Sequence, residues 1–457
     1  MTLTSRNAFS AVDSALIALT RASPTSGDTA YIAAFFADAP DWFSFESKIR
    51  HNDVAPLVYL NLERLGMLGR LPEWLLLRLR DRREKIVAAN RARLLMAADF
   101  LARAKSVGVR VIVLKGVLFA ETLYRDAGYK KMNDMDILVR FEDIEATKRI
   151  YSEMGLLPLV LLEGGAEDPD PRKTHHLPTF VSRDMKFVIG THWALTSPKS
   201  GFHIDHETLW QRAHAVSIGG VDAWALSSED ALHHLCVHFH YYKTGLKELG
   251  DFAALLNGCN DFDWKLFDGL VRSSETQTPV FRALKLVETV YESGVPKSLL
   301  AACRAAAEPF TVQDTEVLVA RRNLLLMSRS TWSSEIEKAY MAFSFESRFK
   351  GKLRWFLIFW HRILRPPLSV LYRTNAVLPG EKPLGMLFYA NLVRTAREIG
   401  RGYGLAAFGL IMAVSTFELI SCLLHSVTGT EDDRMAALCK TFGVNDAGIL
   451  QLMDAME

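Results

Sequence analysis

Two aspartates and a lysine–glycine pair are the residues of this chain whose types and spacing point to phosphate chemistry. Lys115-Gly116 ends one apolar run, and Asp134 and Asp136 stand at the start of another, beginning eighteen residues after Gly116. If residues 134–139 form a strand, side chains alternate between its faces, so both carboxylates project from one face, about 7 Å apart. Two carboxylates this close repel each other unless a cation lies between them, and such an oxygen-rich pair suits Mg²⁺ shared with substrate phosphates.

Short strands and helices must position these side chains. Residues 109–155 predict the order strand, helix, strand, helix, with a polar turn before the aspartates and a stop at Gly155. A strand that ends in Lys-Gly and continues as a helix brings backbone N–H groups and a positive helix end to where a phosphate can sit. Either motif alone is a weak or moderate signal, and the combination is more specific.

Helical segments are expected on both sides of this core. Apolar residues recur at helical spacing over residues 9–105, two strand pairs are predicted within 174–195 and 214–226, and helices follow Ser228. We therefore expect an α+β fold, in which a small mixed β-sheet core lies between large helical regions. The expected divisions are an N-terminal helical region, the core, a C-terminal helical domain, and an apolar helix with an acidic tail, at residues 1–104, 105–226, 227–400 and 401–457.

Composition limits the class of protein and its partners. A chain of 457 residues implies two or three domains, and 49% hydrophobic with 23% charged residues is typical of a folded globular protein. The net charge of +2, from 54 basic and 52 acidic residues, gives no sign of a nucleic-acid-binding surface. Five cysteines without a CxxC motif argue against a disulfide framework and a zinc knuckle, and favour reduced thiols in the cytoplasm.

Membrane association is a weaker alternative. The N-terminus has a short apolar run broken by Asp13, which indicates an amphipathic helix rather than a signal peptide. Residues 403–424 are nearly long enough to span a bilayer, but they include Glu418 and several hydroxyl residues, so a buried or interfacial helix is preferred. Peripheral membrane contact through residues 403–424, or through the aromatic and basic segment 353–364, stays open.

The ordered set of motifs resembles a known family. It is similar to the uncharacterised nucleotidyltransferases of the DNA polymerase beta superfamily, in a bacterial branch whose genes often accompany exopolysaccharide or peptide natural-product clusters. The likeness covers about residues 40–400, and 109–140 is its most specific part. The residues that carry it are Lys115-Gly116, Tyr124, Lys130, Asp134-Met135-Asp136-Ile137-Leu138-Val139, Gly155, His175-His176-Leu177-Pro178, Thr191-His192-Trp193, and the helical segments that reach His238 and Asp251.

This resemblance implies a reaction and a set of site residues. In the superfamily, strand carboxylates bind Mg²⁺ ions that bridge a triphosphate and activate an attacking hydroxyl. Carried over, Asp134 and Asp136 are ligands of Mg²⁺ or Mn²⁺, Lys115 and Gly116 lie under the phosphates, and Lys130 adds positive charge. The implied activity moves a nucleoside monophosphate from an NTP to a hydroxyl or phosphate acceptor on a sugar, metabolite, peptide or protein.

Two positions depart from the family pattern. Lys130 stands where the family usually has arginine, and it supplies a point charge rather than a bidentate fork. Gly190 stands where a third metal-binding carboxylate is expected, before His192. Asp184 or His192 are the alternatives for the missing ligand. A catalytically degenerate nucleotide-binding or scaffold protein on the same fold is therefore the second hypothesis.

Several further polar residues have both a functional and a structural interpretation. His176 could contact phosphate or assist proton transfer, and His192 could line the site, although loop histidines are more often merely exposed. His234 and His238 share one face of a predicted helix, but no cysteine or carboxylate at HExxH-type spacing accompanies them, so packing or capping is favoured over metal binding. Asp251 is expected to make a structural hydrogen bond or salt bridge.

Overall fold

The computed structural model of the chain describes residues 9–38, 40–158, 174–182, 186–240, 245–320 and 383–403. Helices surround one mixed β-sheet, which confirms the α+β class expected from the sequence. Asp184, segment 353–364 and all of 403–424 except its first residue lie outside the described residues.

The N-terminal part is helical because polar residues cap its helices and apolar residues line their inner faces. Ser10 accepts a hydrogen bond from the backbone N–H of Asp13, and Thr25 forms a reciprocal capping box with Asp28. Leu16, Ile17 and other apolar side chains of these helices are fully buried. The helices are α2 (Ala11–Leu19), α3 (Ser26–Ala37), α4 (Trp42–His51), α5 (Ala55–Arg64) and α6 (Glu73–Ser106), with a 3₁₀ turn at Leu68–Arg70.

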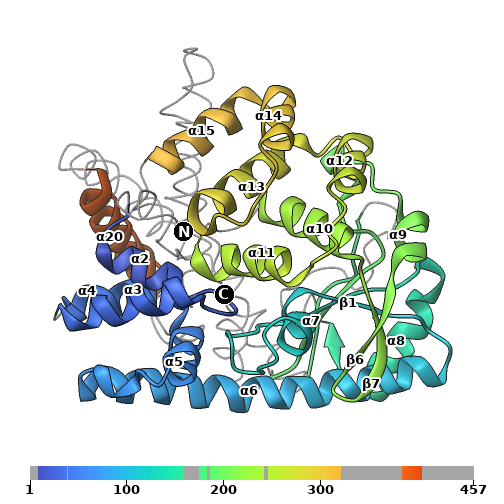
Figure 1. Cartoon of the computed structure of the whole chain (residues 1–457). Coiled ribbons are helices and arrows are strands. Elements are labelled where there is room, and N and C mark those ends of the chain that lie inside the picture. The colour runs from blue at the N-terminus through green and yellow to red at the C-terminus, as the bar shows by residue number, and fades with distance from the viewer. Residues whose placement is uncertain are drawn as a thin grey trace. The chain divides into compact units, whose positions relative to one another are not determined.

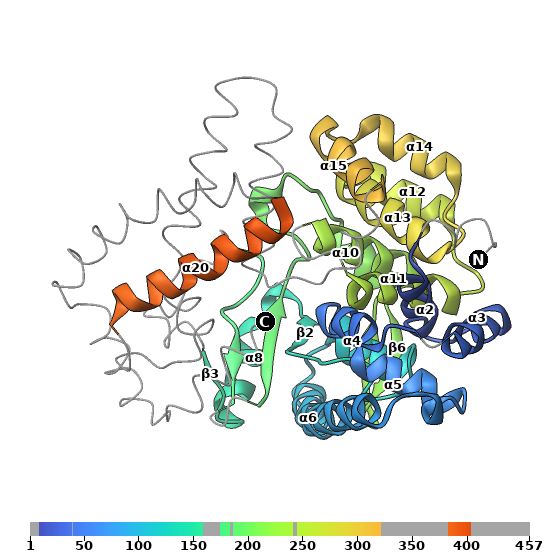
Figure 2. The ribbon, with the colours of Figure 1, turned by 90° about the vertical axis from the view of Figure 1, so that its left-hand side faces the viewer.

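Helix α6 is the longest element in the described part of the chain. It follows Pro72 and ends just before Gly108, whose φ of +79° is a left-handed conformation that favours glycine at a helix end. Its 34 residues pack against α5, against the β6–β7 hairpin (His214–Ile218 and Val221–Ala225) and against α8 (Ile144–Glu153). Figures 1 and 2 show α6 running beneath α5 and this hairpin.

The sheet has seven strands in the order β3-β4-β5-β2-β1-β7-β6. Strand β1 pairs antiparallel with β2 and parallel with β7, while β2 pairs parallel with β5, so the sheet is mixed. The β6–β7 hairpin turns at Gly219-Gly220, where both residues have positive φ, as the sequence predicts. The other strands are β1 (Ile112–Leu114), β2 (Met135–Leu138), β3 (Leu157–Pro158), β4 (Phe180–Val181) and β5 (Val188–His192).

The remaining helices frame the sheet and form a second apolar layer. Helix α13 lies at the centre of this layer and packs against α10, α11, α12, α14 and α15, with Val280, Leu284 and Val287 fully buried. Figure 1 shows α10 and α11 next to α13. The bounds are α7 (Lys115–Thr122), α9 (His206–Arg212), α10 (Ser228–His240), α11 (Leu246–Gly258), α12 (Trp264–Ser273), α13 (Gln277–Tyr291), α14 (Lys297–Ala306) and α15 (Pro309–Ala320), with 3₁₀ turns at Phe141–Asp143 and Pro198–Ser200.

The chain divides into two compact units. The first comprises Met1–Leu156, Pro169–Phe180 and Phe187–Arg329, and the second comprises Leu157–Asp168, Val181–Lys186 and Ser330–Glu457. The second unit includes helix α20 (Leu384–Tyr403). Within the described ranges, no helix is both long and apolar enough to cross a membrane. The domain boundaries expected from the sequence stay a prediction.

The polar turn before β2 is held by side chains of α6. The buried Asn90 amide donates to the carbonyl oxygens of Ala127 and Lys130, at 2.6 and 2.8 Å, and its oxygen accepts from the N–H of Met132 at 3.4 Å. Arg83 forms a bidentate ion pair with Asp126 in the same turn. Helix α6 therefore fixes the path of the chain just ahead of the two aspartates.

Replacing Asn90 with leucine should destabilise the fold, because it leaves backbone groups of this turn buried without partners. We expect a loss of about 3 kcal/mol in the free energy of unfolding, measured by urea denaturation. Lys85→Ala, on the exposed face of the same helix, is the control and should change stability by no more than about 0.5 kcal/mol. Equal stability of the two variants would contradict this role of Asn90.

Candidate functional site

The two aspartates lie where the sheet brings three elements together. Strand β2 begins at Met135, so Asp134 directly precedes it, and Asp136 is its second residue. Asp136 pairs in register with Leu114 on β1 and with Gly190 on β5. The Asp136 side chain is 15% exposed, whereas Asp134 is open to solvent. The two aspartates thus lie at the start of β2, a strand that is flanked by β1 and β5.

Lys115 contacts Asp136 from the turn between β1 and α7. Its Nζ atom lies 3.0 Å from Asp136 Oδ2, and both side chains are 15% exposed. The backbone of Lys115 has a φ of +46°, a left-handed conformation that costs a residue other than glycine about 1–3 kcal/mol. Strand β1 is buried throughout and ends at Leu114, and α7 begins at the next residue, Lys115. The change from strand to helix therefore takes place without a linking residue. The strained backbone places the ammonium group directly against the carboxylate.

Gly116 and Tyr129 join the start of α7 to the turn before β2. The Tyr129 hydroxyl donates to the carbonyl oxygen of Gly116 at 3.2 Å. Leu114 precedes α7 without making a side-chain cap, so the first N–H groups of α7 receive no bond from it. The sequence-predicted phosphate turn is therefore close to Asp136 through Lys115.

Three histidines gather on the other side of Asp136. The Nε2 atom of His192 lies 3.4 Å from Asp136 Oδ1, and the His175 and His176 rings lie 5.6 and 5.5 Å from the His192 ring between centroids. Burial lowers the pKa of His192, and Asp136 partly offsets this. Burial and the neighbouring histidines lower the pKa of His175 to about 4. The predicted residue His192 thus lies next to Asp136, and His176 lies next to His192.

The two carboxylates have opposite electrostatic surroundings. Burial raises the pKa of Asp136, but Lys115 and His192 outweigh it and hold the pKa well below its usual range. Desolvation and the charge of Asp136 raise the pKa of Asp134 to about 7, although its side chain reaches solvent. Asp136 is therefore already compensated by Lys115, whereas the positive charges near Asp134 do not outweigh its desolvation and the charge of Asp136.

Gly190 occupies the position at which a third carboxylate would be expected. Paired residues of parallel strands point to the same face, so a side chain at 190 would lie beside that of Asp136. A Cβ atom there would come 2.7 Å from Asp136 Oδ1 and 3.7 Å from His192 Nε2. Among the described residues, no group of three or more His, Cys, Asp or Glu side chains is arranged to hold a metal ion.

Lys130 is tied to helix α11 rather than directly to the aspartates. Its ammonium group forms an ion pair with Asp251, which also accepts a hydrogen bond from the Tyr124 hydroxyl at 3.1 Å. Asp251 therefore makes the salt bridge that was expected of it. The Tyr124 ring stacks on Tyr129 with centroids 3.9 Å apart. The charge of Lys130 still lowers the pKa of Asp134.

Arg93, His234 and His238 belong to this neighbourhood, although the sequence motifs do not point to it. Burial lowers the pKa of Arg93 and the charge of Asp134 raises it, and its buried Nε atom has no hydrogen-bond partner. Burial and Lys115 lower the pKa values of His234 and His238 well below the usual range. The i, i+4 spacing of His234 and His238 can be recognised in the sequence, but the residues that they meet depend on how α10 packs against the rest of the protein.

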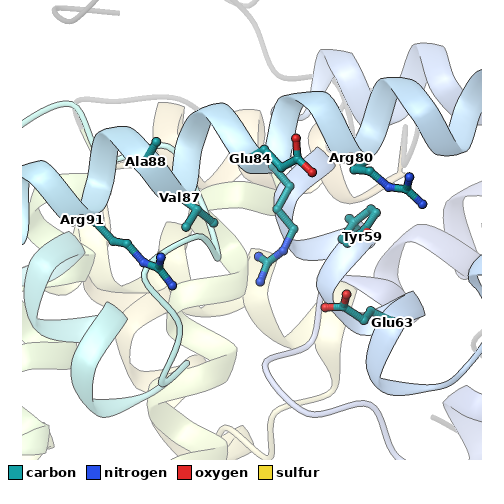
Figure 3. Close-up of a pocket in the computed structure, with 8 residues that line it drawn as sticks. Tyr59, Glu63, Arg80, Glu84, Val87, Ala88 and Arg91 are labelled. Atoms are coloured by element: carbon teal, nitrogen blue, oxygen red, sulfur yellow. The ribbon is translucent and has the colours of Figure 1, made fainter.

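A separate hollow of about 400 Å³ lies between α5 and α6. Figure 3 shows the side chains of α6 and Tyr59 around it. Arg83 lines this hollow and also forms an ion pair with Asp126 in the turn before β2. Arg83 therefore connects the hollow with that turn. None of the residues predicted for the site lines it; its lining is Tyr59, Glu63, Arg80, Arg83, Glu84, Val87, Ala88 and Arg91.

The mixed sheet carries two carboxylates at a central strand, beside a strand–helix turn, within an α+β fold of the nucleotidyltransferase type. The family model of uncharacterised nucleotidyltransferases matches residues 38–292, more than half of the chain, and the chain belongs to that family. Comparison with curated proteins and with solved structures gave no match. The matched region contains every residue of the site described above.

The donor atoms fit one divalent cation better than a closed three-ligand cage. Asp134 and Asp136 offer hard carboxylate oxygens of the kind that Mg²⁺ and Mn²⁺ prefer, and the raised pKa of Asp134 marks negative charge that a cation would stabilise. Lys115 Nζ contacts one oxygen of Asp136, so a cation bound there would compete with this ammonium group. The two aspartates are the residues that would hold the ion.

The binding of Mn²⁺ should depend on pH through Asp134. Its pKa of about 7 means that the carboxyl is protonated below pH 7 and must lose this proton to bind a cation. We expect the affinity to fall by up to about tenfold for each pH unit below 7 and to level off above it, in calorimetric titrations from pH 5.5 to 8. Asp134→Asn should bind weakly and without this slope. A flat profile for the unmodified protein would exclude the mechanism.

Proposed function

We propose that the protein is a Mg²⁺- or Mn²⁺-dependent nucleotidyltransferase that moves a nucleoside monophosphate from an NTP to a hydroxyl or phosphate acceptor. Membership of the family supports nucleotidyl transfer as the general activity. The observation that carries the proposal is the Asp134–Asp136 pair, with Lys115 against it at the strand–helix turn. Such transfer needs little covalent chemistry from the protein and depends mainly on positioning and charge neutralisation.

Each side chain has a role that follows from its place. Asp134 and Asp136 would hold the cation, which would supply neutralisation of the triphosphate charge. With a cation held there, Lys115 would be free to turn its ammonium group to the phosphates, beside the N–H groups that begin α7. Lys130 and Arg93, whose charges interact with Asp134, add positive potential around the triphosphate.

His192 is the side chain best placed to take a proton from the acceptor. Its imidazole is neutral at pH 7, because burial lowers its pKa, and it lies 3.4 Å from Asp136, which would stabilise the protonated ring. His176 is the candidate for a phosphate contact, because its ring lies 5.5 Å from that of His192. Gly116 remains a backbone position next to the phosphates.

The setting of the reaction is part of the proposal. The acceptor classes are a sugar, a small metabolite, a peptide or a protein, and the expected context is polysaccharide or natural-product biosynthesis in the cytoplasm. Nucleic acid is not an expected partner, because basic and acidic residues are nearly balanced at 54 and 52. Peripheral membrane contact through 353–364 or 403–424 stays a secondary proposal.

Removing the carboxylates should abolish transfer. Incubation with α-labelled NTPs and Mg²⁺ or Mn²⁺, with cell extract as the source of acceptors, should label a product in the presence of the unmodified protein. The Asp134→Ala/Asp136→Ala variant should lose at least about a hundredfold of this activity and its metal-dependent NTP binding, since no side chain is left to hold the ion. Equal labelling and equal binding in both proteins would refute the proposed function.

A second candidate function is nucleotide binding without transfer, and Gly190 is the observation that favours it. Introducing Gly190→Asp supplies an acid on the face that carries Asp136, and the nearest atom to the new Cβ, at 2.7 Å, is Oδ1 of the Asp136 side chain rather than a backbone atom. We expect transfer to rise about tenfold or more if the site is merely incomplete. Gly190→Ala is the control for the steric effect, and no transfer by any of the three proteins would favour a binding or scaffold role.

A further inference from the structure

The imidazole of His234 is buried without a hydrogen-bond partner. The residue is 5% exposed, and neither ring nitrogen makes a hydrogen bond with any residue that the structure describes. Buried polar groups in native proteins are nearly always paired, and leaving one unpaired is costly. The neighbouring His233 follows this rule, because its Nε2 atom lies 2.6 Å from the Thr276 hydroxyl. His234 is therefore an exception within its own helix.

The surroundings of His234 connect it with the candidate site. It lies one helical turn before His238, and the two ring centroids are 5.9 Å apart. The charges of Lys115, Asp136 and His192 all act on the His234 ring, so it lies within electrostatic range of the groups that surround the proposed cation site. The unpaired imidazole thus belongs to the region in which the nucleotide and its acceptor would meet.

The chemistry of the ring decides what it can receive. Burial and Lys115 keep the pKa of His234 well below its usual range, so the ring is neutral and has one donor and one acceptor nitrogen. A hydroxyl group also donates and accepts, whereas a phosphate oxygen only accepts and favours cationic donors. A neutral imidazole is therefore complementary to an alcohol rather than to an anion.

We propose that His234, with His238 beside it, forms a hydroxyl-binding subsite next to the Lys115–Asp136 pair. The inference rests on the proposed function for the identity of its ligand, which is either a ribose hydroxyl of the NTP or the hydroxyl of the acceptor. The two ring nitrogens of His234 are then unpaired only in the free protein, and the substrate hydroxyl completes their hydrogen bonds.

Two substitutions separate hydrogen bonding from packing. His234→Leu removes both ring nitrogens at similar volume, and His234→Gln keeps a donor and an acceptor. We expect His234→Leu to leave the melting temperature of the free protein unchanged or higher, because it removes an unpaired buried polar group. Both variants should retain the near-ultraviolet circular dichroism of the unmodified protein, which checks the fold.

Nucleotide affinities test the ribose as the ligand. Calorimetry with Mn²⁺ should compare ATP, 2′-deoxy-ATP and 3′-deoxy-ATP on the three proteins. If the subsite holds the ribose, the unmodified protein binds ATP about tenfold more tightly than one deoxy analogue, His234→Leu binds both equally, and His234→Gln keeps part of the difference. The Asp134→Ala/Asp136→Ala variant tests the proposed function separately, through metal-dependent binding alone.

An acceptor hydroxyl gives a different result. Each nucleotide then binds with equal affinity to all three proteins. The His234 imidazole NMR resonance, identified by its absence from His234→Gln, shifts when glycerol is added with or without ATP, and does not shift with inorganic phosphate. The proposal is overturned if nucleotide affinities are equal and neither ATP nor glycerol moves this resonance, which would mean that a buried water satisfies the ring. This arm needs no nucleotidyl transfer, so it can fail or succeed independently of the proposed function.

Discussion

The contact between Lys115 and Asp136 is the interaction on which the site depends. Asp136 lies on a strand that is buried on both sides by its neighbours, and a carboxylate there needs a counter-charge. Lys115 supplies it from the first position of α7, at the cost of a left-handed backbone. Because β1 runs directly into α7, the ion pair, the strand and the phosphate-facing turn are one structural unit.

Helix α6 and helix α11 keep this unit in place from outside the sheet. Asn90 and Arg83 of α6 hold the turn that leads into β2, and Arg93 of the same helix reaches the neighbourhood of Asp134. From the other direction, Asp251 of α11 pairs with Lys130. Charges around the aspartates are thus fixed by elements far apart in the sequence, which limits how far either carboxylate can move to balance its charge.

The part of the site that the sequence could predict is the part that local geometry determines. Alternation along a strand places Asp134 and Asp136 together, and a strand that ends in Lys-Gly ahead of a helix predicts the turn at Lys115. Arg93 and His234 could not be predicted, because their proximity depends on how α6 and α10 dock against the sheet. Helical spacing shows that His234 and His238 share a face, but not what that face meets.

The charge balance around the aspartates bears on how many cations the site can use. Asp134 and Asp136 carry two negative charges when ionised, Lys115 compensates one, and Lys130 is already paired with Asp251. A third acid at position 190 would add the charge that a second divalent cation requires, and glycine does not supply it. One divalent cation would balance the two carboxylate charges if Lys115 moved away from Asp136. On this argument, glycine at position 190 leaves the site without the third carboxylate that a two-metal arrangement would use.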